Sequence, residues 1–244
     1  MIKKKYFLIL FAVSLVGLIN YLPAKTALPW IITKDTLING VSGTIWNGNA
    51  SEAIHEKVYF RDIKWRFNPE KILLGHLSFD ISLYPLNGYL ETQINKNIDR
   101  TIEFNNLKGF LSAGTLPIIA SYLGVDGHIE LAINHLKLRE NIPLKIDGDI
   151  IIKNLTISGL SNQSIGNYVI KLRPTKENVI GSIEGENALL DVAGTLKVDN
   201  TGNYLISGVV APNVFTPNDI KVFLNFLGSA NDKNQREFRF EGKL

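Results

Sequence analysis

The chain has 244 residues, of which 45% are hydrophobic and 20% charged, so it can build one large or two modest globular domains. It contains no cysteine, which excludes disulfides, thiolate metal sites and cysteine nucleophiles. The net charge of +3 comes from lysines that flank the apolar N-terminus, namely Lys3, Lys4, Lys5 and Lys25. The remainder is close to neutral, so the charge gives no argument for nucleic-acid binding.

The N-terminal residues 6–22 carry no charge and directly follow the three lysines. As a helix with a rise of 1.5 Å per residue they would cover about 25 Å, at the short end of what crosses a hydrocarbon core of about 30 Å. The positive-inside rule keeps Lys3, Lys4 and Lys5 in the cytoplasm, and Tyr6 and Tyr21 are placed as interfacial aromatic residues. We therefore predict a membrane anchor with these five flanking residues.

This anchor divides the chain into a cytoplasmic basic tail (1–5), the transmembrane helix (6–22), a linker (23–38) and an exported domain (39–244). A cleaved signal peptide is the alternative interpretation of the same pattern. It is disfavoured because Leu22 stands where a cleavage site needs a small residue.

A glycine-rich stretch, residues 40–50, opens the exported domain, and its glycines frame Thr44, Ile45 and Trp46. Glycine allows positive φ or close backbone approach, whereas these three residues favour a pleated, half-buried surface. We predict a first strand with glycine-containing turns, in which Trp46 packs against the next strands. A phosphate site is disfavoured because no helix signal follows the glycines.

Beyond Pro29 the dominant period is two, which is typical of half-buried strands. Residues 58–67 alternate with a one-place shift around Arg61-Asp62, which predicts a bulge. Residues 77–83 alternate without interruption, and Pro85 to Gly88 supply a turn. Further strands are predicted at residues 90–94, 102–104, 129–133, 144–152, 168–172, 188–198, 204–210 and 238–244.

Two segments break this alternation. Thr216, as an N-cap, and Pro217, as the first helical residue, begin a predicted short amphipathic helix that ends at Gly228. A weaker helix signal covers residues 115–123. The fold class is therefore mainly β: an N-terminal transmembrane helix, then a curved, mostly antiparallel sheet (an open groove or an incomplete barrel or sandwich) with one or two short packing helices. A weak repeat at Gly127 and Gly148 supports stacked hairpins.

Residues suited to catalysis or metal binding are scattered. The four histidines have no carboxylate pattern that completes a metal set, so surface or structural roles are favoured. Asp147 and Asp149 share one face of a predicted strand, where solvated or paired carboxylates are favoured over an acid/base dyad. No nucleophile elbow, phosphate loop or His-Glu-x-x-His is present. We predict that the protein is not an enzyme and that it binds no cofactor and no metal.

Several runs together carry a family likeness: the span followed by Leu22-Pro23-Ala24, the run from Gly40 to Gly48, the run from Ile63 to Pro69, and the C-terminal Phe226 to Leu244. The chain resembles protein N of the bacterial type II secretion system. Its signature positions are Gly40, Gly43, Thr44, Trp46, Gly48 and Trp65.

The resemblance implies an inner-membrane protein with a cytoplasmic N-terminus and a periplasmic domain. It implies an accessory role in export of folded proteins across the outer membrane, with other secretion-system proteins as partners and no catalytic or cofactor residues to carry over. The balance of charge described above predicts no nucleic-acid partner. The alternative function is a periplasmic β-groove protein that binds or transfers lipids, because long alternating strands would also line a groove for acyl chains. An envelope hydrolase is a distant third.

Overall fold

The structure is a computed structural model that describes residues 6–244 apart from 8, 11–13, 15–16, 19, 34, 116–123, 162 and 176–177. The described residues form one antiparallel sheet of 14 strands. The strands are β1 (Thr36–Asn39), β2 (Ser42–Gly43), β3 (Asn47–His55), β4 (Val58–Phe67), β5 (His76–Pro85), β6 (Tyr89–Asn97), β7 (Ile102–Ser112), β8 (Val125–Arg139), β9 (Ile142–Ile157), β10 (Gly166–Pro174), β11 (Asn178–Glu186), β12 (Leu190–Asp199), β13 (Asn203–Pro212) and β14 (Arg236–Lys243).

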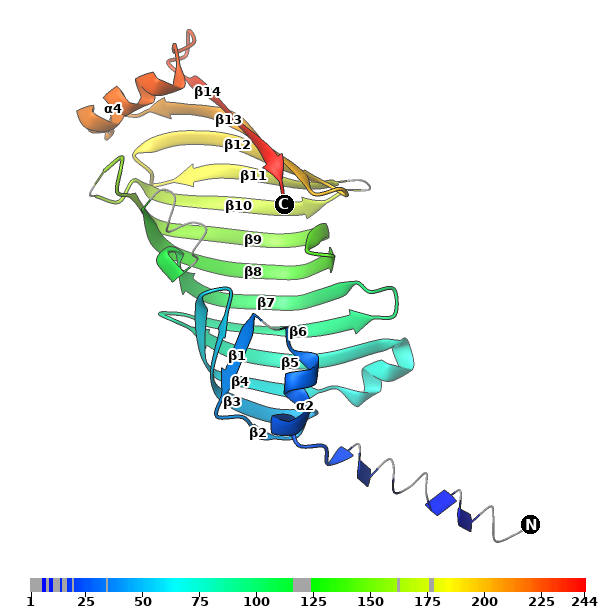
Figure 1. The fold of residues 1–244 in the computed structure, drawn as a ribbon. Helices are drawn as coiled ribbons and strands as arrows, with labels where there is room; N and C mark the ends of the chain where they lie inside the picture. The colour runs from blue at the N-terminus through cyan, green and yellow to red at the C-terminus, as the bar shows by residue number, and fades with distance from the viewer. Residues whose placement is uncertain are drawn as a thin grey trace.

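From β3 to β14, strands that follow one another in the sequence are also neighbours in the sheet. β1 pairs with β3, and the short strand β2 pairs with β3 as well. β1 and β14 are the two ends of this order, so the sheet is open and curls along its length (Figure 1). The prediction of a mainly β, antiparallel and open architecture is confirmed. Of the shapes left open by the sequence, the open groove is the one that the protein adopts.

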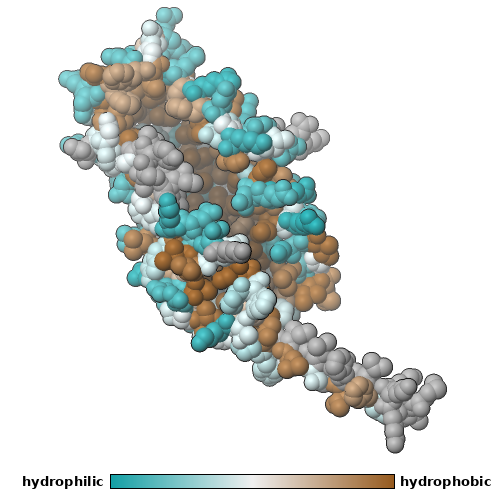
Figure 2. All heavy atoms as spheres, in the orientation of Figure 1, coloured by the Kyte–Doolittle hydropathy of each residue, from teal (hydrophilic) through white to brown (hydrophobic). Residues whose placement is uncertain are grey.

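The register separates an apolar from a polar face. One row of paired residues crosses β4 to β9 as Phe67, Phe79, Ile94, Phe104, Leu136 and Ile146. The adjacent row crosses the same strands as Arg66, Asp80, Gln93, Asn105, His135 and Asp147. Figure 2 shows hydrophobic side chains gathered in the hollow of the molecule, with hydrophilic residues along its rims. Period-two alternation thus places the core on one face of the sheet.

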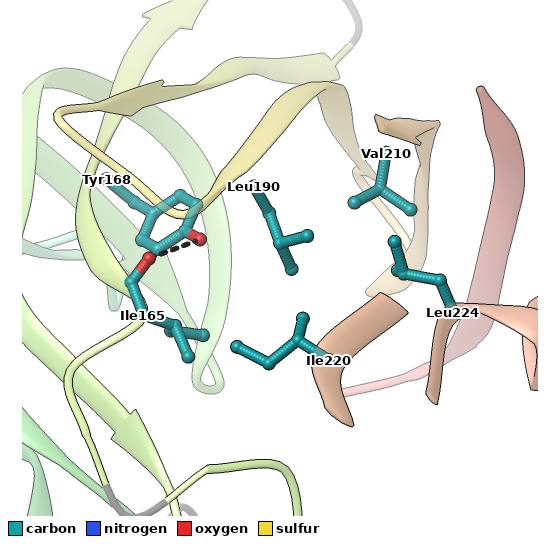
Figure 3. Packing of buried hydrophobic residues seen from close by; sticks show 6 residues of the cluster. All are labelled: Ile165, Tyr168, Leu190, Val210, Ile220 and Leu224. Atoms are coloured by element: carbon teal, nitrogen blue, oxygen red, sulfur yellow. Dashed lines mark hydrogen bonds between the residues drawn. The ribbon is translucent and has the colours of Figure 1, made fainter. Parts of the chain in front are cut away.

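One end of the apolar face is covered by helix α4 (Asn218–Leu224). Ile220 and Leu224 of α4 are buried against Leu190 and Val210 of the sheet, and Tyr168 lies in the same cluster (Figure 3). The Tyr168 hydroxyl donates a hydrogen bond to the carbonyl oxygen of Ile165 at 3.4 Å, and burial raises the Tyr168 pKa to about 12. The predicted packing role of this helix is confirmed.

The predicted cap of α4 is wrong by one residue. The helix begins at Asn218, with Pro217 in the N-cap position and no side-chain cap. The Thr216 hydroxyl instead donates to the Leu189 carbonyl oxygen and accepts from the Asn213 N–H at 2.7 Å. The loop therefore takes the side chain that would have capped the helix. A short 3₁₀ turn, η3 (Asn225–Leu227), extends the run to Gly228.

The bulge predicted in residues 58–67 is confirmed: Asp62 has φ of 47°, and the β4–β5 register shifts between Arg61 and Lys64. The second predicted helix is not described beyond Thr115, which belongs to the 3₁₀ turn η2 (Ala113–Thr115), because residues 116–123 lie outside the described residues. A further 3₁₀ helix, η1 (Pro69–Leu74), joins β4 to β5.

The predicted linker spans residues 23–38. It contains helix α2 (Ala24–Ile31), which continues through Pro29, and most of β1. The predicted anchor falls partly outside the described residues, and in the part of the chain that is described no helix is long and apolar enough to cross a membrane. The transmembrane helix therefore stays a prediction.

Candidate functional site at the junction of the N-terminal segment and the sheet

The N-terminal segment meets the sheet at the loop between β2 and β3. The Ile45 N–H donates to the carbonyl oxygen of Leu22 at 3.1 Å, and Pro23 forms an isolated antiparallel bridge with Thr44. The next residue, Ala24, is fully buried. The chain is therefore fixed to the sheet at the point where the apolar segment ends.

Thr44, Ile45 and Trp46 form this loop and not the core of a strand, which corrects the prediction. The Thr44 N–H donates to the Asn47 carbonyl oxygen at 2.8 Å. The Thr44 hydroxyl oxygen accepts from the N–H groups of Trp46 at 3.3 Å and Asn47 at 3.1 Å. Local hydrogen bonds from a threonine side chain compete with strand pairing, which is why a sequence of good strand formers turns here. The first strand is β1.

Trp65 joins the loop from β4. Its indole N–H donates to the Thr44 carbonyl oxygen at 3.1 Å, and its backbone pairs with Gly48. A Cβ added at Gly48 would lie 2.4 Å from Cζ2 of Trp65 and 2.6 Å from the Ser42 carbonyl oxygen. Only glycine leaves room for the indole at this position.

The other two signature glycines, Gly40 and Gly43, both have positive φ. Gly43 has φ of 84°, and a Cβ there would lie 2.4 Å from the Asn47 carbonyl oxygen. Gly40 has φ of 64°, at the turn between β1 and β2, where a Cβ would meet the Ser51 hydroxyl at 2.2 Å. The structure therefore brings Gly43, Thr44, Gly48 and Trp65 together with Trp46, and places Gly40 one turn away.

The Trp46 ring is half-buried against an aromatic row that continues into the sheet. Its centroid lies 4.7 Å from that of Phe67, which in turn lies 5.3 Å from Phe79. The Trp46 carbonyl oxygen accepts from the Phe67 N–H at 2.7 Å. The expected packing of Trp46 against the next strands is present, although the ring is not fully buried.

The predicted anchor flanks are placed only in part. Lys3, Lys4 and Lys5 lie outside the described residues, and the side chains of Tyr6 and Tyr21 are exposed. Sequence reasoning missed Pro23 and Ala24 as members of the junction. The signal was the Leu-Pro-Ala run itself, which the sequence analysis used for the cleavage site and the family likeness and not as a contact with the sheet.

A second candidate region is an open cavity of about 580 Å³ on the polar face, lined by residues of β4 to β7. The Tyr89 hydroxyl donates to the Glu91 carboxylate, and that hydrogen bond raises the Tyr89 pKa to about 12. Hydrogen bonds from Lys108 and Tyr89 lower the Glu91 pKa, with Lys108 Nζ 2.7 Å from Glu91. Both hydrogen bonds thus move the pKa of Tyr89 and the pKa of Glu91 away from neutral pH, where a general acid or base works best.

The histidines do not converge on one point. The Nδ1 atoms of His55, His76 and His135 contact Thr36, Asn97 and Asn105 respectively, and His128 stacks near Phe110 with 4.9 Å between centroids. No group of three metal-binding side chains occurs among the described residues.

Asp147 and Asp149 lie on one face, as predicted, and both approach the same arginine. Arg173 Nη1 is 3.1 Å from Asp149 and 3.8 Å from Asp147. Arg173 is therefore a shared cationic partner of the two carboxylates, which fits the predicted paired carboxylates better than an acid/base dyad.

Comparison with known proteins gives two relatives and a family. A protein from Vibrio cholerae named type II secretion system protein N is 30% identical over 98% of both chains. A protein of the same name from Aeromonas hydrophila is 20% identical over 96% of both chains. No solved structure matches the chain. Neither relative's name mentions lipid, and the lipid-groove alternative is not favoured. The sequence profile of the family described as type II secretion system, protein N, matches residues 36–239, from the first residue of β1 into β14; the chain belongs to this family.

Proposed function

We propose that the protein is an accessory component of the type II secretion system that works through protein–protein contacts. The observation that carries the proposal is the extent of the family match, which covers the sheet from β1 to β14. The unit shared with the family is therefore the whole sheet and not one motif within it. This role requires no catalytic chemistry.

The location that fits this role is the inner membrane, with residues 6–22 as the anchor and the sheet in the periplasm. The apolar run supports the anchor through its sequence, and the Leu22–Ile45 hydrogen bond supports a fixed connection between anchor and sheet. In this proposal the signature residues Thr44, Gly48 and Trp65 hold the exit of the anchor against the sheet.

Contacts with other secretion proteins can be tested by photo-crosslinking in cells. A photoreactive residue at Phe226, whose side chain is exposed beyond α4, is compared with one at Ile220, which is buried under the helix. We expect crosslinked products from Phe226 to contain other type II secretion proteins and the Ile220 control to give none. If exposed positions capture no secretion protein and deletion leaves secretion of exoproteins intact, the proposal fails.

A further inference from the structure

The antiparallel register fixes which loops share a long edge of the sheet. The N-terminal end of β3 pairs with the C-terminal end of β4 through Asn47 and Arg66, and Phe67 pairs with Phe79 near the start of β5. His76 at the start of β5 pairs with Asn97 at the end of β6. The loop that binds Leu22, helix η1 and the β6–β7 turn therefore lie along one edge, which we call the anchor-side edge (Figure 1).

The anchor-side edge carries large apolar side chains that contact solvent. Three consecutive residues of η1, Ile72, Leu73 and Leu74, are exposed, and Leu73 is 90% exposed. Ile98 in the β6–β7 turn is 89% exposed. A Cβ at Gly75, which ends η1, would lie 3.7 Å from the Ile98 side chain. The two loops therefore form one apolar projection, unlike the singly scattered apolar residues of an ordinary surface.

The position of the N-terminal segment indicates what covers this projection. The apolar run 6–22 ends at Leu22, whose carbonyl is bound by the loop on the same edge. A bilayer that takes up this run would face the anchor-side edge. Trp30, on the helix that begins directly after Pro23, is 89% exposed, and tryptophan is the residue enriched at membrane interfaces.

Charge within the two loops of the projection is balanced. Lys71 and Glu70 lie in η1, and Arg100 and Asp99 lie in the β6–β7 turn. Attraction to anionic headgroups is therefore weak, and apolar burial is the dominant contribution. The two loops show no excess of one charge that would select an oppositely charged protein partner.

We propose that the apolar projection, which consists of Ile72, Leu73 and Leu74 of η1 together with Ile98, inserts into the lipid bilayer that holds the N-terminal segment. This second membrane contact would fix the tilt of the sheet relative to the membrane. The inference rests on the anchor in the proposed function. Lipid, and not a protein partner or a second copy of the chain, then covers the projection.

The absence of native cysteine allows a direct test with single-cysteine variants of the full chain. Leu73→Cys probes the projection, and Val214→Cys is the matched control, since Val214 is 88% exposed and follows β13 at the opposite long edge. Each is labelled with an environment-sensitive nitrobenzoxadiazole dye. The protein is reconstituted in vesicles of phosphatidylethanolamine and phosphatidylglycerol, with and without doxyl-labelled lipid.

We expect blue-shifted emission at residue 73 that doxyl lipid quenches strongly and aqueous iodide quenches weakly, with the reverse at residue 214; Ile98→Cys should behave as Leu73→Cys. Equal iodide quenching at residues 73 and 214 would overturn the proposal. So would shielding of residue 73 from both quenchers, because a protein or a second copy would then cover it. The purified protein is measured alone, so a negative result leaves the proposed secretion role standing.

Discussion

Replacing Trp46 with alanine tests whether the junction stabilises the folded sheet. Loss of a fully buried tryptophan costs about 3–5 kcal/mol. The Trp46 ring is half-buried, which lowers that contribution to about half, and its contact with Phe67 at 4.7 Å adds about 0.5–1.5 kcal/mol. We therefore expect Trp46→Ala to lower the free energy of unfolding by about 2–4 kcal/mol.

Thermal unfolding of the purified full-length protein, followed by circular dichroism, measures this effect. A domain of this size shifts its midpoint by roughly 2–4 °C per kcal/mol, so we expect a drop of about 4–16 °C. Trp30→Ala is the matched control, because Trp30 is exposed and its loss should stay within about 0.5 kcal/mol. An unchanged midpoint for Trp46→Ala, together with lost complex assembly in cells, would refute the reasoning and make Trp46 a docking residue.

Three further changes test other parts of the structure by the same unfolding assay. Ile220→Ala should destabilise the protein by about 2–5 kcal/mol because the side chain is 0% exposed under α4, whereas Val222→Ala on the exposed side of that helix should have little effect. Gly48→Ala should lower the free energy of unfolding by about 1–3 kcal/mol, because the added Cβ clashes with the Trp65 ring. Gly159→Ala is the control and should have no such effect, because a Cβ there meets nothing within 4 Å. Equal midpoints for the two glycine variants would contradict the packing at the junction. Asp199, whose pKa is lowered to about 2 by hydrogen bonds from Thr201 and Asn203, should stabilise the folded state above its ordinary pKa of 3.8 and lose that effect as the pH falls toward 2. The midpoint difference between the protein and Asp199→Asn should therefore shrink between pH 5 and pH 2, and a constant difference would contradict this role.

Strands were predictable where one face is apolar and the alternation is uninterrupted. Residues 77–83 satisfy both conditions and lie within β5. β7 was predicted only at residues 102–104, although it extends to Ser112. Asn106, with φ of 52°, adds a residue that shifts the alternation by one place, which hides the continuation of the strand.

β11 was missed for a different reason. Gly181 and Gly185 occupy positions on its apolar face, opposite Leu172 and Tyr168. The neighbouring strands supply the large side chains there, and a Cβ at Gly181 would lie 3.1 Å from the Leu172 side chain. On that face only Val179 and Ile183 carry large side chains, so the two glycines interrupt the period that sequence analysis detects.

The junction was predictable as a set of residue types and not as a geometry. Glycines next to Trp46 indicated close packing. The pairing of Trp65 with the Thr44 carbonyl oxygen joins residues far apart in the sequence, and the Leu22–Ile45 bond joins two backbone groups, which leave no side-chain pattern. Local propensity also favoured a strand at Thr44 to Trp46, and the Thr44 hydroxyl bonds outweigh it.

The central claim is the role in type II secretion, and the most direct measurement is the distribution of a secreted exoprotein between medium and periplasm. Cells that lack this protein are compared with the same cells supplied with the full chain. The account predicts that exoprotein accumulates in the periplasm without the chain and returns to the medium when the chain is restored. Unchanged export in the deletion strain would contradict it.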